Sequence, residues 1–286
     1  MTSDFSRMAR TASFFLVAAA MVFGVAPSAS AEPGFGDWVN GHASRARLVV
    51  GAKLAPGEYL AGVQIQLDPG WHTYWRNPGD SGVPPSFDWS QSVNVAQAEV
   101  EWPAPISIPD AFGTSIGYLD EVVFPVVVKP ENMDDRTTLR LTLDHAVCRE
   151  ICVPLSSELS TELEAGDTPS ARAIALVNSY QQLVPRRQGV GEKLEPEIAG
   201  ASSRRDGDRV VLVVEASSAT PADMYVEGPS RFFFPAASGV ADGGQGNTRF
   251  VIEVEGAKSP GDLVGAELTA TLVSSRGSVE HSWTAE

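Results

Sequence analysis

Cysteine is scarce in this chain. Only two occur in 286 residues, and both lie in the segment DHAVCREICVP, residues 144–154. Two cysteines are too few for a disulfide-rich scaffold, and a chain of this length can bury a core without one. The sequence also lacks the glycine-rich phosphate loop and the H-E-x-x-H pattern of zinc proteases. These absences leave the cysteine pair, Cys148 and Cys152, as the main candidate for chemistry.

Long apolar runs are absent beyond the first thirty residues. Arg7 and Arg10 precede an apolar run of about fifteen residues, and the small residues of ASA, 29–31, follow it. This layout is typical of a secretory signal peptide, and the run is shorter than the ~20 residues of a spanning helix. We therefore expect residues 1–31 to be a cleaved signal and the rest to be exported, with no stable membrane insertion after cleavage.

Positive charge is also in short supply. The chain has 21 Lys and Arg against 36 Asp and Glu, which gives a formal net charge of −15. Such an acidic protein is repelled by nucleic acid and by anionic membrane surfaces, so neither is an expected partner.

The sequence predicts an all-β fold. From Ala46 to about Leu163, short segments with β-branched residues and two-residue alternation are separated by Gly and Pro, which is typical of an antiparallel sandwich. Pro125 within VVFPVVV predicts a strand edge or a bulge. A second strand-rich region, which includes RVVLVVEA and RFFFPAAS, follows from about Ala201 to Glu286.

A single helix is expected between the two strand-rich regions. In DTPSARAIALVNSYQQLVPRR, Thr168 is the predicted N-cap, Pro169 the first helical residue and Pro185 the stop, for about fifteen residues. We predict a first β-sandwich domain over 32–165, a linker with this helix over 166–200, and a second, smaller β-sandwich domain over 201–286.

The cysteine pair is predicted to lie in a β-hairpin. TLRLTLDHAVC and CVPLSSELSTEL alternate like strands, and Pro154 disfavours a helix. The three residues REI would then form the connection, with Cys148 and Cys152 opposed across the neck. Opposed residues of an antiparallel pair are close enough for a disulfide.

Three interpretations of the pair remain open on chemical grounds. A structural staple and a redox pair are about equally supported, because so short a loop gives a bridge little unfolded-state entropy to remove. A metal clip with His145 and His72 is less favoured, because C-x3-C is not a common zinc spacing.

Aromatic residues gather in GWHTYWRNPGDSGVPPSFDW, residues 70–89. Core packing is the simpler explanation, above all for Trp89, and the alternative for Trp71 and Tyr74 is that they flank a site, since clustered aromatic residues in irregular backbone often line binding surfaces. His72 has no Ser or Asp partner for a hydrolase triad, and Asp120 with Glu121 is typical of a solvated turn.

Together with EWPAPISIPDAFGTSIGYLDEVVFPVVV and CREICVPLSSEL, this stretch resembles the N-terminal periplasmic domain family of the thiol:disulfide interchange protein DsbD, in particular its ScsB-like, copper-tolerance members. The resemblance covers about Gly51 to Leu163 and implies an immunoglobulin-like β-sandwich. It also implies that Cys148 and Cys152 are a redox-active disulfide. Phe112 of a cap loop would shield the pair, Asp110 would lie near it, and Tyr74 and Trp71 would pack around it.

The resemblance further implies a function and partners. The expected activity is periplasmic thiol–disulfide interchange of the protein-disulfide reductase type, without a cofactor or bound metal. The expected partners are periplasmic thioredoxin-like proteins, and a separate membrane protein would supply electrons because no transmembrane domain follows. Arg149 would lower the thiol pKa, whereas Glu150 and Asp110 would raise it. The alternative is a non-catalytic binding module with a structural disulfide, linked to copper tolerance.

Overall fold

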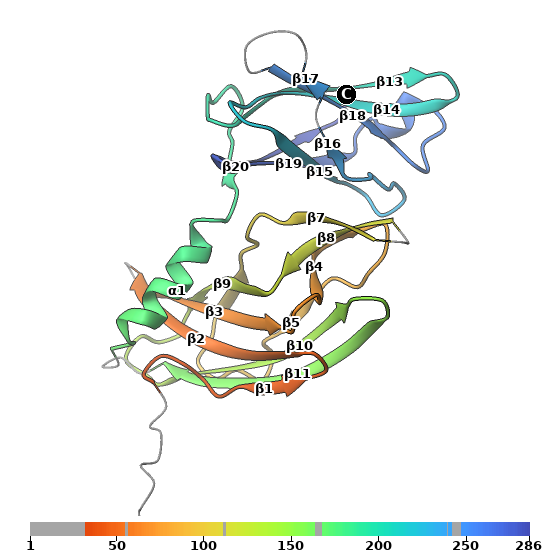
Figure 1. Ribbon diagram of the computed structural model, residues 1–286. Helices are drawn as coiled ribbons and strands as arrows, with labels where there is room; N and C mark the ends of the chain where they lie inside the picture. The colour runs from red at the N-terminus through yellow and green to blue at the C-terminus, as the bar shows by residue number, and fades with distance from the viewer. Residues whose placement is uncertain (1–31, 55–56, 111–112, 164–167, 239, 242–246) are drawn as a thin grey trace, which may run out of the picture. The chain divides into compact units, whose positions relative to one another are not determined.

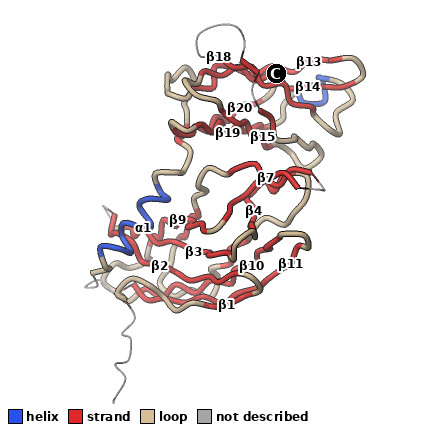
Figure 2. The backbone as a smooth tube through the Cα atoms, viewed as in Figure 1, coloured by secondary structure: helices blue, strands red, loops and turns tan. Residues whose placement is uncertain are grey.

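The computed structural model describes residues 32–54, 57–110, 113–163, 168–238, 240–241 and 247–286. Its regular structure is mainly β, with one pair of sheets, then a single α-helix, then a second pair of sheets along the chain (Figure 1). Both regions consist mainly of strands and loops, and the α-helix lies between them in the sequence (Figure 2). The expectation of an all-β, sandwich-type fold is confirmed. Among the described residues, no helix is long and apolar enough to cross a membrane.

The first region is built from two antiparallel sheets. One sheet has the order β1(Val39–Gly41), β2(Ser44–Leu54), β3(Glu58–Leu67), β9(Glu121–Lys129), β6(Gln97–Val100). The other has the order β11(Cys152–Leu163), β10(Thr137–Cys148), β4(His72–Gly79), β8(Gly113–Leu119), β7(Ile106–Asp110), and β5(Ser86–Asp88) pairs with β10.

The core of this region comes from alternate residues of its strands. Leu139, Leu141 and Leu143 of β10 are fully buried, whereas Arg140 between them is exposed. Successive side chains of a strand point to opposite faces, so one face of β10 packs inward with strands of the facing sheet, such as β3 and β9. Trp89 is half-buried against this core, as the simpler explanation predicted.

The prediction that Pro125 marks an edge or a bulge is wrong. Strand β9 pairs with β3 through an unbroken register that includes Gly62↔Pro125, and it pairs with β6 on its other side. The carbonyl of Pro125 accepts from the backbone N–H of Glu101, just beyond the last β6 residue, Val100. In an antiparallel strand, the N–H and the carbonyl of one residue point to the same side. The nitrogen of Pro125 therefore faces the β6 side just beyond the last β6–β9 pair, where its lack of an N–H breaks no ladder hydrogen bond.

The helix is shorter than expected. It is α1(Ala171–Gln181), and its N-cap is Ser170, whose side chain accepts from the Ala173 N–H, rather than Thr168. Ala173 and Val177 are buried against Phe35, Val49 and Leu60, which places the helix on the outer face of the β2–β3–β9 sheet (Figure 1). Leu183 lies beyond the end of the helix and is exposed.

The second region again has two sheets. Their orders are β12(Arg186–Arg187), β20(Gly277–Thr284), β19(Glu267–Ser274), β15(Ala222–Glu227), β16(Ala237–Ser238), and β13(Glu197–Asp206), β14(Arg209–Ser217), β18(Asn247–Glu253), β17(Val240–Ala241). A short 3-10 helix, Pro260–Leu263, precedes β19. Strand β13 begins at Glu197, earlier than the predicted start near Ala201. Of RFFFPAAS only Ala237 and Ser238 form a strand, and Phe232 and Phe234 fill the core instead.

Candidate functional site

The two cysteines close the hairpin of β10 and β11. The register runs without a break from Thr137↔Leu163 to Cys148↔Cys152, so the connection is the three residues Arg149, Glu150 and Ile151. A disulfide joins Cys148 to Cys152, whose Cα atoms lie 4.1 Å apart. The predicted hairpin and its three-residue connection are confirmed. Because the cysteines are opposed at the last pair of the ladder, the bridge forms without disturbing the strands.

The two sulfur-bearing residues differ in exposure. Cys148 is 6% exposed, because β10 is an interior strand with β4 on its other side. Cys152 begins the edge strand β11 and is exposed. Next to it, Ile151 at the tip of the hairpin is 75% exposed. Cys152 is therefore the more exposed of the two bonded cysteines.

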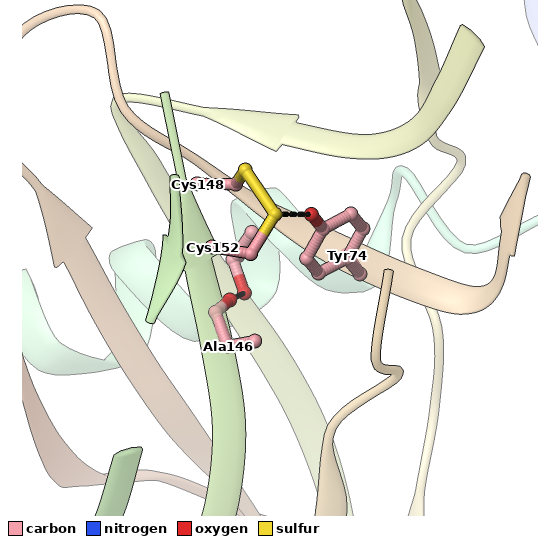
Figure 3. Close-up of a disulfide and its surroundings, with 5 residues drawn as sticks. Tyr74, Ala146, Cys148 and Cys152 are labelled. Carbon is pink, nitrogen blue, oxygen red and sulfur yellow. Dashed lines mark hydrogen bonds between the residues drawn. A yellow bond between two sulfur atoms is a disulfide. The ribbon is translucent and has the colours of Figure 1, made fainter. Parts of the chain in front are cut away.

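Tyr74 of β4 contacts the disulfide directly. Its hydroxyl oxygen lies 3.1 Å from the Cys152 Sγ, and its ring is fully buried with Ala146 and Cys148 (Figure 3). The Thr73 hydroxyl donates to the Ala146 carbonyl, at 2.9 Å, and fixes β4 against β10 at this point. A phenolic O–H beside a cysteine sulfur can donate to the thiolate that forms on reduction, which stabilises the charged form.

A glycine allows Tyr74 to occupy this place. Gly82 has a φ of +131°, and a Cβ built on it would lie 2.2 Å from the Tyr74 ring. Any larger residue at 82 would displace the tyrosine. From the sequence, the glycine in GDSGVPP is the one sign of a close contact at position 82. Nothing in that segment shows that the contact is with Tyr74.

Asp80 connects the same segment to the β7–β8 hairpin. Its carboxylate accepts from the Thr114 N–H at 2.6 Å, and its own N–H donates to the Thr114 carbonyl. A Cβ on Gly113 would collide with the Asp80 side chain, so only glycine fits there. Asp80 was not predicted as a site residue.

Of the predicted cap residues, only the backbone of Asp110 is described. It pairs with Gly113 at the end of the β7–β8 ladder. Phe112 and the side chain of Asp110 lie outside the described residues. Their roles as shield and neighbouring acid stay predictions.

Trp71 lies close to the site but touches a different part of it. It precedes β4 and packs edge-on against His42, with ring centroids 5.0 Å apart. The Arg149 guanidinium at the hairpin tip lies 5.6 Å from the Trp71 ring. Trp71 therefore supports the connection between the cysteines, whereas Tyr74 contacts the sulfur.

The geometry does not support a metal clip. His72 is opposite Cys148 in the β10–β4 ladder, so these two side chains share a face. His145 is three residues before Cys148 on a continuous strand, which puts its side chain on the other face. Burial lowers the pKa of His145. Within the part of the chain that the structure describes, no group of three or more metal-ligating side chains was found.

Fold and site together define a β-sandwich domain with a disulfide across the neck of an edge hairpin. Residues 45–164 match the family described as thiol:disulfide interchange protein DsbD, N-terminal. This match agrees with the resemblance drawn from the sequence.

The fold extends the likeness beyond that segment. The crystal structure of the N-terminal periplasmic domain of ScsB from Proteus mirabilis superposes with a TM-score of 0.69, at 23% sequence identity. The match covers 89% of this chain and 99% of that one, so the common fold includes most of both sheet regions. No curated protein matches the sequence significantly.

Proposed function

We propose that this protein catalyses thiol–disulfide interchange through Cys148 and Cys152, as a protein-disulfide reductase. The observation that carries the proposal is the asymmetric pair itself, an exposed Cys152 bonded to a buried Cys148 in a segment that matches the DsbD N-terminal family. A bridge that only stapled the hairpin would not need one cysteine to be exposed, nor a tyrosine hydroxyl beside its sulfur.

The reaction begins from the reduced pair. The Cys152 thiolate attacks one sulfur of a partner's disulfide, and the partner's other sulfur leaves as a thiolate that takes up a proton. The Cys148 thiolate then attacks the Cys152 sulfur and releases the partner's second sulfur. Two electrons pass to the partner, which leaves as a dithiol, and the Cys148–Cys152 disulfide forms again. Tyr74 assists by donating to the Cys152 thiolate before the attack.

The proposed location and partners follow from this reaction. The protein acts in the periplasm after removal of residues 1–31, where a disulfide can persist. Its acceptors are thioredoxin-like proteins, and a separate membrane protein returns electrons to the oxidised pair. The similar ScsB domain is a periplasmic domain, which supports this location.

A mixed-disulfide trap tests the proposal. Cys148→Ala leaves the Cys152 thiolate able to attack but removes the sulfur that resolves the intermediate. We expect this variant to accumulate covalent complexes that dissolve under reductant, and Cys152→Ala to form none. The proposal is wrong if neither variant captures a partner, or if Cys152→Ala keeps full reductase activity. A reduction potential below about −300 mV would instead favour the structural disulfide of a binding module.

A further inference from the structure

Three arginines gather on the side of the first region that carries the helix, away from the disulfide hairpin. On β2 the alternation that buries Ala46 and Leu48 turns Arg45 and Arg47 to the outer face of the sheet. Helix α1 lies on that face and adds Arg172 from its first turn. No role in the proposed exchange reaction requires these residues.

The arginines line a cavity with an apolar wall. Its volume is about 520 Å³, within the range of ~300–1,000 Å³ typical of small-molecule sites. Trp38 forms one wall, with the guanidinium carbons of Arg45 and Arg47 at 4.3 and 4.0 Å from its ring centroid. Ala175 and Leu176 of α1 also line the cavity.

Amide groups, rather than carboxylates, hold two of the arginines. Arg45 donates to the Gln66 Oε1, and Arg47 donates through Nε to the Gln64 Oε1 at 2.7 Å. Both glutamines donate in turn to one oxygen of Glu121. Among the residues that the structure describes, no carboxylate forms a salt bridge with Arg45 or Arg47. The sheet thus fixes the two guanidinium groups without neutralising them.

The cavity is positive in an otherwise acidic protein. Three arginines and a single carboxylate, that of Glu121, line it, and a second carboxylate, that of Glu32, forms a salt bridge with Arg172 at 2.8 Å from outside the lining. The cluster keeps an excess of one positive charge, whereas the whole chain has a net charge of −15. Burial lowers the pKa of Arg47, the charges of Arg172 and Arg45 lower it further, and those of Glu121 and Glu32 offset only part of this effect. Like charges held this close repel one another, and an anion placed between them would relieve the repulsion.

We propose that this cavity binds a small organic anion. Its carboxylate or phosphate group would accept hydrogen bonds from Arg47 and Arg172, since the Arg47 terminal amino groups have no hydrogen-bond partner among the described residues. Its flat or apolar part would lie against Trp38 and Leu176. The charge of Arg45 adds to the attraction. A purely structural role for the arginines is the competing explanation, and it predicts no ligand.

Calorimetric titration of the full chain at low ionic strength tests the site. The probes are phenylacetate and phenyl phosphate, with phenylacetamide as the neutral molecule of matching shape. We expect saturable binding of at least one anion and at least tenfold weaker binding of the amide. If neither anion binds, or if the amide binds equally well, the proposal is overturned.

Variants locate the binding. Arg172→Gln changes a side chain that is 73% exposed, so it should leave the fold intact while weakening anion binding at least tenfold. Arg47→Gln should weaken it at least as much, with circular dichroism to verify folding. Arg140→Gln, an exposed arginine on β10, is the matched control and should bind like the wild type. Equal affinity in all three variants would place the binding elsewhere and overturn the proposal.

Discussion

Two long hairpins in this protein close in different ways. The β10–β11 hairpin has 12 residues in each strand and a disulfide at its last pair. The β13–β14 hairpin, with strands of 10 and 9 residues, turns through Gly207 and Asp208 without any crosslink. In both hairpins one strand lies at a sheet edge and the other inside the sheet. A hairpin of this kind therefore forms without a covalent bridge.

This comparison indicates that the disulfide serves a chemical reaction and is not needed to hold the β10–β11 hairpin together. Hydrogen bonds and inward-facing residues such as Val210 and Leu212 are enough to hold the second hairpin. The first hairpin has the same means of support in Leu139, Leu141 and Leu143. What it has in addition is an exposed cysteine residue, a tyrosine hydroxyl against the sulfur of that cysteine, and a neighbouring glycine that makes room for the tyrosine. The following predictions test this distinction, from the largest expected effect to the smallest.

Loss of Cys152 should abolish exchange and leave the fold in place. We expect Cys152→Ala to lower the rate of reduction of a disulfide-bonded protein by about 10³-fold or more, because no other thiol can replace the attacking one. Reductase assays measure the rate, and circular dichroism verifies folding. A variant that loses activity only because it unfolds would contradict the comparison.

Glycine to alanine changes should affect the two hairpin regions unequally. At Gly82 an added methyl collides with the Tyr74 ring, so we expect a loss of about 2–3 kcal/mol in the free energy of unfolding and slower exchange. At Gly207 the added methyl meets open space, and only its φ of +60° opposes it, at a cost of about 1 kcal/mol. Urea unfolding of both variants measures the difference. Equal losses would mean that the Gly82 contact with Tyr74 does not constrain the site.

Reduction of the disulfide should destabilise the protein only modestly. Opening so short a loop returns little entropy to the unfolded chain, and we expect the free energy of unfolding to fall by about 2 kcal/mol at most. Urea unfolding with and without reductant gives the value. If the free energy of unfolding fell by several times this amount, the disulfide would be a structural staple, and the β10–β11 hairpin would depend on its crosslink as the β13–β14 hairpin does not.

Removing the Tyr74 hydroxyl should raise the pKa of the Cys152 thiol. The hydrogen bond from Tyr74 stabilises the thiolate by about 1.4 kcal/mol, so its loss should raise the pKa by about one unit. Exchange near neutral pH should then slow by only about threefold, because the smaller thiolate fraction is partly offset by the greater nucleophilicity of a thiolate of higher pKa. The pH dependence of alkylation, compared between Cys148→Ala and Tyr74→Phe/Cys148→Ala, measures the shift. Tyr59→Phe, a buried tyrosine on β3, is the control. An unchanged alkylation profile would leave Tyr74 with packing alone.

Acid should weaken the β10 strand through His145. Burial holds its pKa in the folded state below the unfolded value of ~6.5, so the folded protein binds fewer protons. The stability associated with the neutral ring is complete above that value and is lost as the pH falls below it. We expect His145→Gln to reduce the loss between about pH 7.5 and about pH 5 in urea unfolding. A steeper loss in the variant would contradict this assignment.

The pattern of neighbouring residues correctly predicted features that depend only on neighbouring residues. Alternation in TLRLTLDHAVC and CVPLSSELSTEL, with Pro154 against a helix, was enough to predict the hairpin and its three-residue connection. It was not enough at Pro125, because whether a strand has a neighbour on each side depends on segments distant in the sequence. The helix start was misplaced at Thr168 because Ser170 is an equally good cap, and packing of Ala173 and Val177 on the sheet selects between them.

The sequence by itself determined the all-β class, the pairing of Cys148 with Cys152 and the acidic character of the chain, since alternation, spacing and charge are properties of neighbouring residues and of composition. Only the tertiary structure decided which of the two cysteine residues is exposed, and that the Tyr74 hydroxyl, 78 residues away in the sequence, contacts the Cys152 sulfur. It also decided that Gly82 makes room for that tyrosine and that Arg45, Arg47 and Arg172 line one cavity. These contacts arise where separate strands and a helix pack together, and no local pattern encodes such packing.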